Sequence, residues 1–328
     1  MQNNLVQILN LKKYFRIKKG IFFKTNDYIK AVDNVEINIQ ANKTLGLVGE
    51  SGSGKTTLSK CILKLLNPDE GKIIFDGIDI TNYSMKQMIP LRKRMQIIFQ
   101  DPYSSLNPRF TVLKTILEGM NIHKIYDIEK RYERVHELLN MVGLNDNDLN
   151  KFPHEFSGGQ RQRIVIARAL SLNPDFIVCD EPVSSLDVSI QSQIINLLKD
   201  LQMQLNLTYL FISHNLAVIR NISDDIAIMY LGQIVEYASS EKIFLEPKHP
   251  YTKALLNATP EINPDKKPHR IVLKGNIPSA SKIPNGCRFH PRCPEKIKEC
   301  SYIEPVLSIN ESHQVRCLLY KECFPDII

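Results

Sequence analysis

The sequence predicts an α/β fold in which short, mostly parallel strands alternate with helices around a phosphate-binding loop. Apolar runs of strand length recur between helical stretches, and a glycine-rich loop stands directly between a buried strand and a helix. Two of the later apolar runs end at polar residues, Gln100 and Asp180. Strands that alternate with helices favour a parallel sheet covered on both faces.

The expected elements follow in order along the chain. Residues 5–45 alternate in the manner of edge strands, and a basic and aromatic loop over residues 18–27 interrupts them. A buried strand over 44–48 enters the glycine-rich loop, and a helix over 55–66 leaves it. Further strands are expected over 95–99, 176–179, 207–213, 226–230 and 234–237, with helices after residue 158 and over 186–205.

The chain is expected to contain one large domain with a helical insertion and a smaller C-terminal region. Apolar residues have helical spacing from residue 110 to about 144, which predicts a helical subdomain at about 101–165. Beyond residue 240 the composition shifts toward proline and cysteine. We therefore expect one large α/β domain over 1–235 and a separate region over 236–328.

Composition indicates where the protein is located more clearly than it indicates what the protein does. The 328 residues carry a net charge of +7, and no apolar run approaches the roughly 20 residues that span a bilayer. The N-terminus lacks a secretory signal, so a cytosolic chain is expected. Seven cysteines in such a compartment argue against disulfides, and Cys61 and Cys179 are expected to be small core residues. The positive charge favours a lysine-rich solvated surface, with attraction to anionic lipid or to nucleic acid as alternatives.

The glycine-rich loop has the composition of a phosphate-binding loop. Its glycines let the backbone curl so that successive N–H groups point inward, and the following helix adds its N-terminal donors. Lys55 supplies a point charge, and Thr56 supplies a hydroxyl suited to Mg²⁺. The predicted nucleotide contacts are Gly49, Glu50, Ser51, Gly52, Ser53, Gly54, Lys55, Thr56 and Thr57.

Two acidic residues follow the apolar run over 176–179. Asp180 stands at the carboxyl end of this strand, where open α/β sheets bind ligands, and is expected to hold Mg²⁺ through water. Glu181 comes next and is the candidate general base for the attacking water. These two residues predict nucleotide hydrolysis in addition to binding.

A further motif, Ser157-Gly158-Gly159-Gln160, stands at the start of an expected helix. A phosphate-binding loop does not require such a motif in its own active site. With this motif the chain resembles the nucleotide-binding subunit of an ATP-binding cassette (ABC) transporter, although Phe156 replaces the commoner leucine. The resemblance implies a P-loop NTPase with a RecA-like core, an antiparallel β edge and a helical subdomain. It also implies that this motif contacts the γ phosphate of ATP held by an opposite subunit, so that ATP joins a dimer.

Other positions match the family one at a time. The resemblance implies that Gln100 contacts Mg²⁺ and the attacking water, that Asp187 links the two active sites, and that His214 hydrogen-bonds the γ phosphate. Spacing places Phe15 best for stacking on adenine, while Tyr14 and Tyr28 remain alternatives.

Longer stretches resemble the ATPases of oligopeptide and dipeptide importers, and the loop near residues 18–27 resembles the F-type of their two ATPase subunits. The matching stretches cover residues 100–109, 186–191 and 249–255. The resemblance implies peptide import with a second, different ATPase subunit, two transmembrane permease subunits and an extracytoplasmic binding protein. The chain is then expected at the cytoplasmic face of the membrane, as a peripheral subunit, with no nucleic acid partner.

The C-terminal region contains four cysteines whose spacing matches the same importers, where they can hold a [4Fe–4S] cluster. These are Cys287, Cys293, Cys300 and Cys317. Four thiolates also suit zinc, although the paired knuckles usual for zinc are missing, and a site without metal stays open. Cys323 is expected to be a bystander.

Alternative functions remain for the ATPase. Similar chains serve nickel and other solutes, and some soluble ABC ATPases act on DNA or ribosomes. Ribosome-acting relatives carry two cassettes in one chain, whereas this chain has one, and DNA-repair relatives contain zinc modules or coiled coils that are not apparent here. A regulatory subunit that binds ATP without hydrolysing it is disfavoured by the presence of Glu181 and His214.

Overall fold

The computed structural model describes residues 3–17, 28–258, 273, 275, 278–308 and 312–325. The chain divides into two compact units, one formed by 1–39, 45–81 and 213–328 and the other by 40–44 and 82–212. The basic loop expected over 18–27 lies outside the described residues. No helix within the described ranges is both long enough and apolar enough to cross a membrane.

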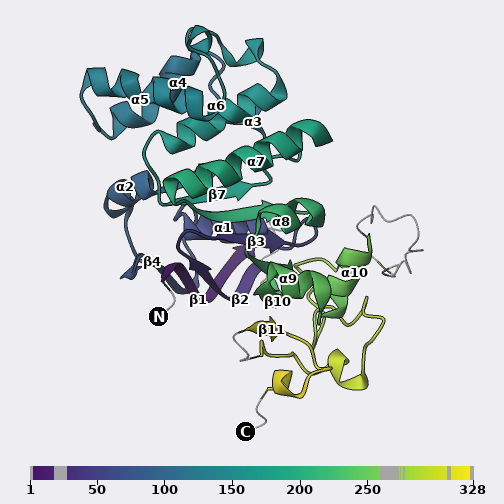
Figure 1. Ribbon diagram of the computed structural model, residues 1–328. Helices are drawn as coiled ribbons and strands as arrows, with labels where there is room; N and C mark the ends of the chain where they lie inside the picture. The colour runs from purple at the N-terminus through teal and green to yellow at the C-terminus, as the bar shows by residue number, and fades with distance from the viewer. Residues whose placement is uncertain are drawn as a thin grey trace. The chain divides into compact units, whose positions relative to one another are not determined.

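The first unit contains an antiparallel sheet with the strand order β2-β1-β4-β5 (Figure 1). Its strands are β1 (Asn4–Arg16), β2 (Tyr28–Gln40), β4 (Glu70–Phe75) and β5 (Ile78–Asp79). In β2 the side chains of Val35, Ile37 and Ile39 are buried, whereas the residues between them are exposed. This alternation is the period of two on which the sequence prediction of edge strands was based.

Four strands of the first unit belong to the second sheet, in the order β11-β10-β9-β3. They are β3 (Thr44–Val48), β9 (Asp225–Tyr230), β10 (Gln233–Ser239) and β11 (His313–Val315). β3 and β9 are parallel, while β10 pairs antiparallel with both β9 and β11. The C-terminal region therefore contributes a strand to the same sheet as the strand that precedes the phosphate loop.

The helices of the first unit flank the phosphate loop and open the C-terminal region. They are α1 (Lys55–Ile62), α8 (Leu216–Ile222), α9 (Ser240–Leu245) and α10 (Pro250–Ala258), with short 3₁₀ turns η3 (Lys298–Ser301) and η4 (Lys321–Cys323). α1 is shorter than the expected helix over 55–66. Lys64 has a left-handed backbone with φ of 54°, and such a residue ends a helix.

The second unit combines parallel strands with a group of helices. Strands β6 (Met95–Ile98), β7 (Phe176–Asp180) and β8 (Thr208–Ser213) are parallel, with β7 in the middle and wholly buried. Helices α3 (Pro102–Ser105), α4 (Val112–Ile122) and α5 (Ile128–Met141) all contact α6 (Gly158–Leu170), as Figure 1 shows. The remaining elements are α2 (Met85–Arg94), η1 (Asp146–Asp148), η2 (Pro153–Glu155) and α7 (Val188–Leu205).

The structure confirms the predicted fold class, with parallel strands in both units and an antiparallel sheet at the N-terminal edge. The antiparallel strands β10 and β11 are the exception to a mostly parallel sheet. Cys61 and Cys179 are fully buried core residues, as expected. Burial raises the pKa of Cys61 to about 11, so its thiol stays neutral.

Candidate functional site

The predicted phosphate loop joins β3 to α1 in the first unit. Gly54 is the residue before α1 and has φ of 109°, a conformation that glycine adopts at little cost. A side chain there would also meet the backbone oxygen of Ala31 at 2.0 Å. The loop therefore requires glycine at residue 54 for two separate steric reasons.

The ammonium group of Lys55 points back into the loop. Its Nζ donates to the backbone oxygens of Gly49 at 2.7 Å and Glu50 at 3.0 Å, and the Lys55 side chain is buried. Two carbonyl oxygens of the loop thus accept from the Lys55 ammonium, which is predicted to bind phosphate. Thr56, whose hydroxyl is predicted to hold Mg²⁺, is an exposed residue at the start of α1, and Thr57 is half-buried.

Glu50 is held by the C-terminal region, a contact that the sequence did not reveal. Arg292 Nη1 lies 2.7 Å from Glu50 Oε2, and Arg292 Nη2 lies 3.0 Å from Glu50 Oε1. The backbone N–H of Glu50 donates to the hydroxyl of Tyr251 at 3.0 Å. The hydrogen bonds of Glu50 raise the pKa of the Arg292 guanidinium above its ordinary value, so the guanidinium stays charged.

The second unit brings together the predicted hydrolytic residues. Asp180 ends β7 and is buried, and Glu181 follows it directly. Gln100, just after β6, donates from Nε2 to Glu181 Oε2 at 3.0 Å. Glu181 has φ of 49°, which is a strained conformation for a residue with a side chain and is typical of functional positions.

The Ser-Gly-Gly-Gln motif forms the N-terminus of α6. Ser157 Oγ accepts from the backbone N–H of Gln160 at 3.3 Å, and the Gln160 side chain accepts from the Ser157 N–H at 3.0 Å. This reciprocal pair is a capping box. A Cβ at Gly159 would meet Ile190 Cγ2 at 2.6 Å, so Gly159 allows close packing on α7. Phe156 is buried in front of the motif.

Asp187 caps α7 in the second unit. Its carboxylate accepts from Ser189 Oγ at 2.6 Å and from the Ile190 N–H at 3.0 Å, and these bonds lower its pKa. His214 belongs to the first unit and is exposed in the turn between β8 and α8. The structure thus groups the predicted residues within each unit: the phosphate loop and His214 in one, and the other motifs in the second.

The three aromatic candidates for adenine stacking differ in their surroundings. Tyr14 donates its hydroxyl to Asp33, which commits that side chain to a partly buried hydrogen bond. Phe15, on the opposite face of β1, remains 37% exposed, with the Lys13 ammonium 5.7 Å from its ring centroid. The exposed ring of Phe15 is therefore consistent with the assignment made from spacing.

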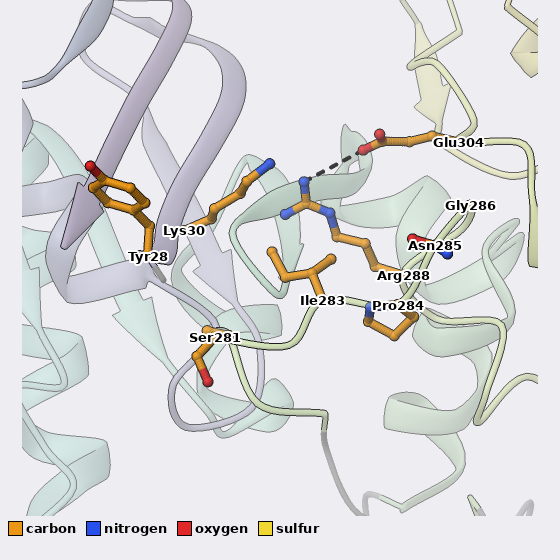
Figure 2. A pocket seen from close by; sticks show the side chains of 10 residues that line it. Tyr28, Lys30, Ser281, Ile283, Pro284, Asn285, Gly286, Arg288 and Glu304 are labelled. Carbon is orange, nitrogen blue, oxygen red and sulfur yellow. Dashed lines mark hydrogen bonds and ion pairs between the residues drawn. The ribbon is translucent and has the colours of Figure 1, made fainter. Parts of the chain in front are cut away.

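Tyr28 lines a polar cavity of about 360 Å³ between the start of β2 and the C-terminal region. Figure 2 shows Tyr28 and Lys30 on one wall and Arg288 on the other, with Arg288 directed toward Glu304. Arg288 also pairs with Asp33 and donates to the Leu231 oxygen at 2.6 Å. Arg288 thereby ties the C-terminal region to β2 and to the turn after β9.

The four predicted cysteine ligands belong to the first unit and lie near one another. Burial raises the pKa of Cys287 to about 11 and that of Cys317 to about 12, and the neighbouring thiols add to both shifts. Backbone N–H groups of Phe289, Glu295 and Leu319 donate to the sulfur atoms of Cys287, Cys293 and Cys317. Within the described residues, however, no three His, Cys, Asp or Glu side chains are arranged so that they could hold a metal ion.

Two functional candidates were missed by sequence reasoning, Arg292 and Tyr251. Both contact Glu50 in the phosphate loop. The signal available in the sequence was limited to the position of Arg292 beside Cys293 and of Tyr251 in the stretch over 249–255. Neither position indicates a contact with a loop about 200 or more residues earlier.

Family models match two parts of the chain. The model described as ABC transporter matches residues 32–184, which include the phosphate loop, the Ser-Gly-Gly-Gln motif and Glu181. The model described as Oligopeptide/dipeptide transporter, C-terminal region, matches residues 235–300.

Curated relatives match over nearly the whole length. The chain is 48% identical over 325 residues to the oligopeptide transport ATP-binding protein AppF of Bacillus subtilis, covering 97% of this chain and 98% of the relative. It is 43% identical over 317 residues to the dipeptide transport ATP-binding protein DppF of Escherichia coli, covering 97% and 95%.

Solved structures match the ATPase part of the fold. One is the ATP-binding cassette MJ0796, described as a dimeric post-hydrolysis state bound to ADP and Pi, with a TM-score of 0.64 and 28% identity. The match covers 72% of this chain and 98% of that one. Another is cbiO1 from Clostridium perfringens, part of the ABC transporter complex cbiONQ, with a TM-score of 0.65, 26% identity, and coverage of 75% and 92%.

Proposed function

Because this chain belongs to the ATP-binding subunits of oligopeptide and dipeptide ABC transporters, we propose that it hydrolyses ATP to power the import of peptides. One observation carries this proposal above all: the likeness to peptide transport ATPases extends through the C-terminal region, at residues 235–300, and is not confined to the ATPase part. That region matches a family model that is described by peptide transporters and not by ABC ATPases in general.

The nucleotide chemistry is proposed for the residues that the sequence motifs predict. We propose that the backbone of residues 49–57 and the ammonium of Lys55 hold the phosphates, with the hydroxyl of Thr56 and the side chains of Asp180 and Gln100 holding Mg²⁺. Mg²⁺, when bound, offsets negative charge on the phosphates. Support comes from the exposed position of Thr56 and from the buried carboxylate of Asp180 at the end of β7.

Glu181 is proposed as the general base that takes a proton from the attacking water. Gln100 orients its carboxylate through the 3.0 Å hydrogen bond, and the strained backbone at Glu181 fixes the direction of the side chain. His214 is proposed to donate to the γ phosphate, and Phe15 to stack on adenine. The exposed positions of His214 and Phe15 support these roles because both can reach a ligand.

A second ATPase subunit is proposed as the direct partner. The backbone N–H groups at the start of α6, in Ser157, Gly158, Gly159 and Gln160, would contact ATP held by that partner, and Asp187 would connect the two sites. The similar cassette MJ0796 is described as dimeric. We further propose a heterodimer at the cytoplasmic face of the membrane, with two permease subunits and an extracytoplasmic binding protein.

We propose that the ATPase domain covers residues 1–235 and that the C-terminal region covers residues 236–328. The helical subdomain is proposed at about 101–165. The beginning of the C-terminal family match at residue 235 supports the first boundary. Helices α3, α4, α5 and α6, which pack together, support the second.

The four C-terminal cysteines are proposed as ligands of a [4Fe–4S] cluster, with zinc as the competing metal. Backbone N–H groups that donate to three of the sulfurs support this proposal because such donors stabilise negative sulfur, although burial raises the pKa of all three thiols. Analysis of iron, sulfide and zinc in anaerobically purified protein tests this. Iron and sulfide that disappear in C287S and C300S variants support the cluster, and protein without any of the three overturns both metal assignments.

The function is tested by isolating this chain from gently solubilised membranes and identifying the proteins that accompany it. Recovery of a second ATPase and two multispanning proteins, with peptide uptake that stops in an E181Q strain, is the expected result. Recovery of ribosomes or DNA-bound proteins from the soluble fraction contradicts the proposal. Uptake of a metal ion or another solute in place of peptides contradicts only the substrate.

A further inference from the structure

The C-terminal region contacts the phosphate loop at one residue, Glu50. Glu50 stands second in the loop, and both its side chain and its backbone are engaged. Arg292 forms a bidentate ion pair with the carboxylate at 2.7 and 3.0 Å, and Tyr251 accepts from the backbone N–H at 3.0 Å. A bidentate pair fixes both distance and orientation, so Glu50 has little freedom to turn.

The groups that hold Glu50 are themselves buried. The side chain of Arg292 is 7% exposed and that of Glu50 is 26% exposed, while Tyr251 is wholly buried. Removing Arg292 from this partly buried pair leaves the Glu50 carboxylate without its counter-charge, which costs more than losing a fully exposed ion pair. The loop therefore gains a defined position from contacts outside its own sequence.

Arg292 is supported by an aromatic cluster and by a second arginine in the same segment. Its guanidinium lies 6.0 Å from the ring centroid of Tyr230, and that ring packs against Tyr251 and Phe289 at 4.8 and 5.3 Å. Arg288 anchors the beginning of the segment to Asp33 and to the Leu231 oxygen. The segment from 287 to 293 is thus held at one end by Asp33 and the Leu231 oxygen and at the other end by Glu50.

We propose that Arg292 and Tyr251 are positioning residues for the phosphate loop, through which the cysteine-containing C-terminal region sets the affinity for ATP. The proposal rests on the proposed function of the loop as an ATP site. Neither residue is placed in contact with ATP. They act by fixing Glu50, because the N–H groups of the residues that follow Gly49 must converge on the bound phosphates, and small displacements weaken such contacts strongly.

The proposal is tested on the full-length chain with an R292M variant. We expect the Kd for Mg·ATP to rise about 10-fold, while turnover at saturating ATP in the assembled complex stays within about twofold, because positioning affects binding more than the chemical step. The matched control is K253M. Lys253 forms an ion pair with Glu295 at 3.1 Å in the same region but does not engage Glu50. Its Kd is expected to match that of the wild-type protein.

Two further variants separate positioning from simple destabilisation. In a double-mutant cycle, R292M is expected to have almost no added effect on Kd in an E50Q background, since the pair is already broken. R292K retains the charge without the bidentate geometry, so an intermediate Kd at an unchanged melting temperature is expected. Hydrogen exchange of residues 49–54 in the ATP-free protein should speed up in R292M and Y251F but not in K253M.

An R292M protein that melts normally and binds ATP as tightly as the wild-type protein overturns the proposal. If R292M does not fold, R292K and Y251F decide it by the same Kd measurement, and wild-type affinity in both overturns it. The proposed function is judged separately. Wild-type protein that fails to bind ATP, or to support peptide uptake, defeats that function, whereas a failure confined to the variant comparison defeats only the positioning role.

Discussion

Gln100 donates a hydrogen bond to Glu181 at 3.0 Å, joining the second residue after β6 to the first residue after β7. The neighbouring parallel strands β6 and β7 run in register from Met95 and Phe176, so their carboxyl ends lie at one edge. Two residues separated by 81 positions thereby meet as the group that is proposed to act in hydrolysis.

The first prediction concerns this group. E181Q removes the proposed base while it keeps the shape of the side chain, so steady-state ATP hydrolysis should fall by about 100-fold or more with ATP affinity retained. D200N, a change in the exposed acid of α7, should leave both quantities unchanged. Hydrolysis assays and ATP titrations of the two variants check this, and sustained turnover by E181Q would remove Glu181 from the catalytic role.

The second prediction concerns Gly54. The G54A side chain would lie 2.0 Å from the Ala31 oxygen in a left-handed conformation, so we expect a loss of unfolding free energy on the order of 3 kcal/mol and severely weakened ATP binding. Gly77 also has positive φ, at 75°, but a Cβ added there would have no atom within 4 Å. G77A should therefore cost about 1 kcal/mol and leave ATP affinity unaltered. Equal effects of the two changes in urea unfolding contradict this reasoning.

The third prediction compares two helix capping boxes that are built from the same residue types, serine and glutamine. Ser157 and Gln160 cap α6, and Ser84 and Gln87 cap α2 in the same way. S157A and S84A should each lower the unfolding free energy by about 1 kcal/mol. Only S157A should also weaken ATP-dependent association with the second ATPase subunit, measured by light scattering. If S84A impairs association as strongly, the α6 N-terminus has no special part in pairing.

The fourth prediction is a pH dependence of stability that arises from His249. Its imidazole is 1% exposed, and burial lowers its pKa to about 4, although the Glu236 carboxylate nearby opposes the shift. The unfolded chain binds the proton near its ordinary pKa of about 6.5, so between these values the unfolded state holds more protons. The unfolding free energy should therefore fall as the pH drops through that window, by up to about 3 kcal/mol.

The H249N variant isolates this contribution. Its side-chain oxygen can accept from the backbone N–H of Tyr251, as His249 Nδ1 does at 3.0 Å, but it does not titrate. Urea unfolding at about pH 7 and about pH 5 should show a smaller loss in H249N than in the wild-type chain. An identical loss in both proteins contradicts the assignment to His249.

Sequence patterns were sufficient for the elements that depend on local signals. The strand over 44–48 was predicted with its observed bounds, because a short apolar run between polar residues is a local feature. The loop after it was predicted because a glycine-rich run followed by Lys-Thr is typical of phosphate-binding loops. The end of α1 was placed too late, since the left-handed Lys64 that ends it has no sequence signal comparable to glycine.

By itself the sequence determined the order of the phosphate, hydrolytic and Ser-Gly-Gly-Gln motifs, and hence the ABC family and its ATPase chemistry. Only the tertiary structure decided that β11 pairs with β10, that Arg288 pairs with Asp33, and that Arg292 holds Glu50. The last two pairs are separated by 255 and 242 residues. Local propensity and spacing carry no information about which buried charges meet after such long separations, because that choice depends on how the whole core packs.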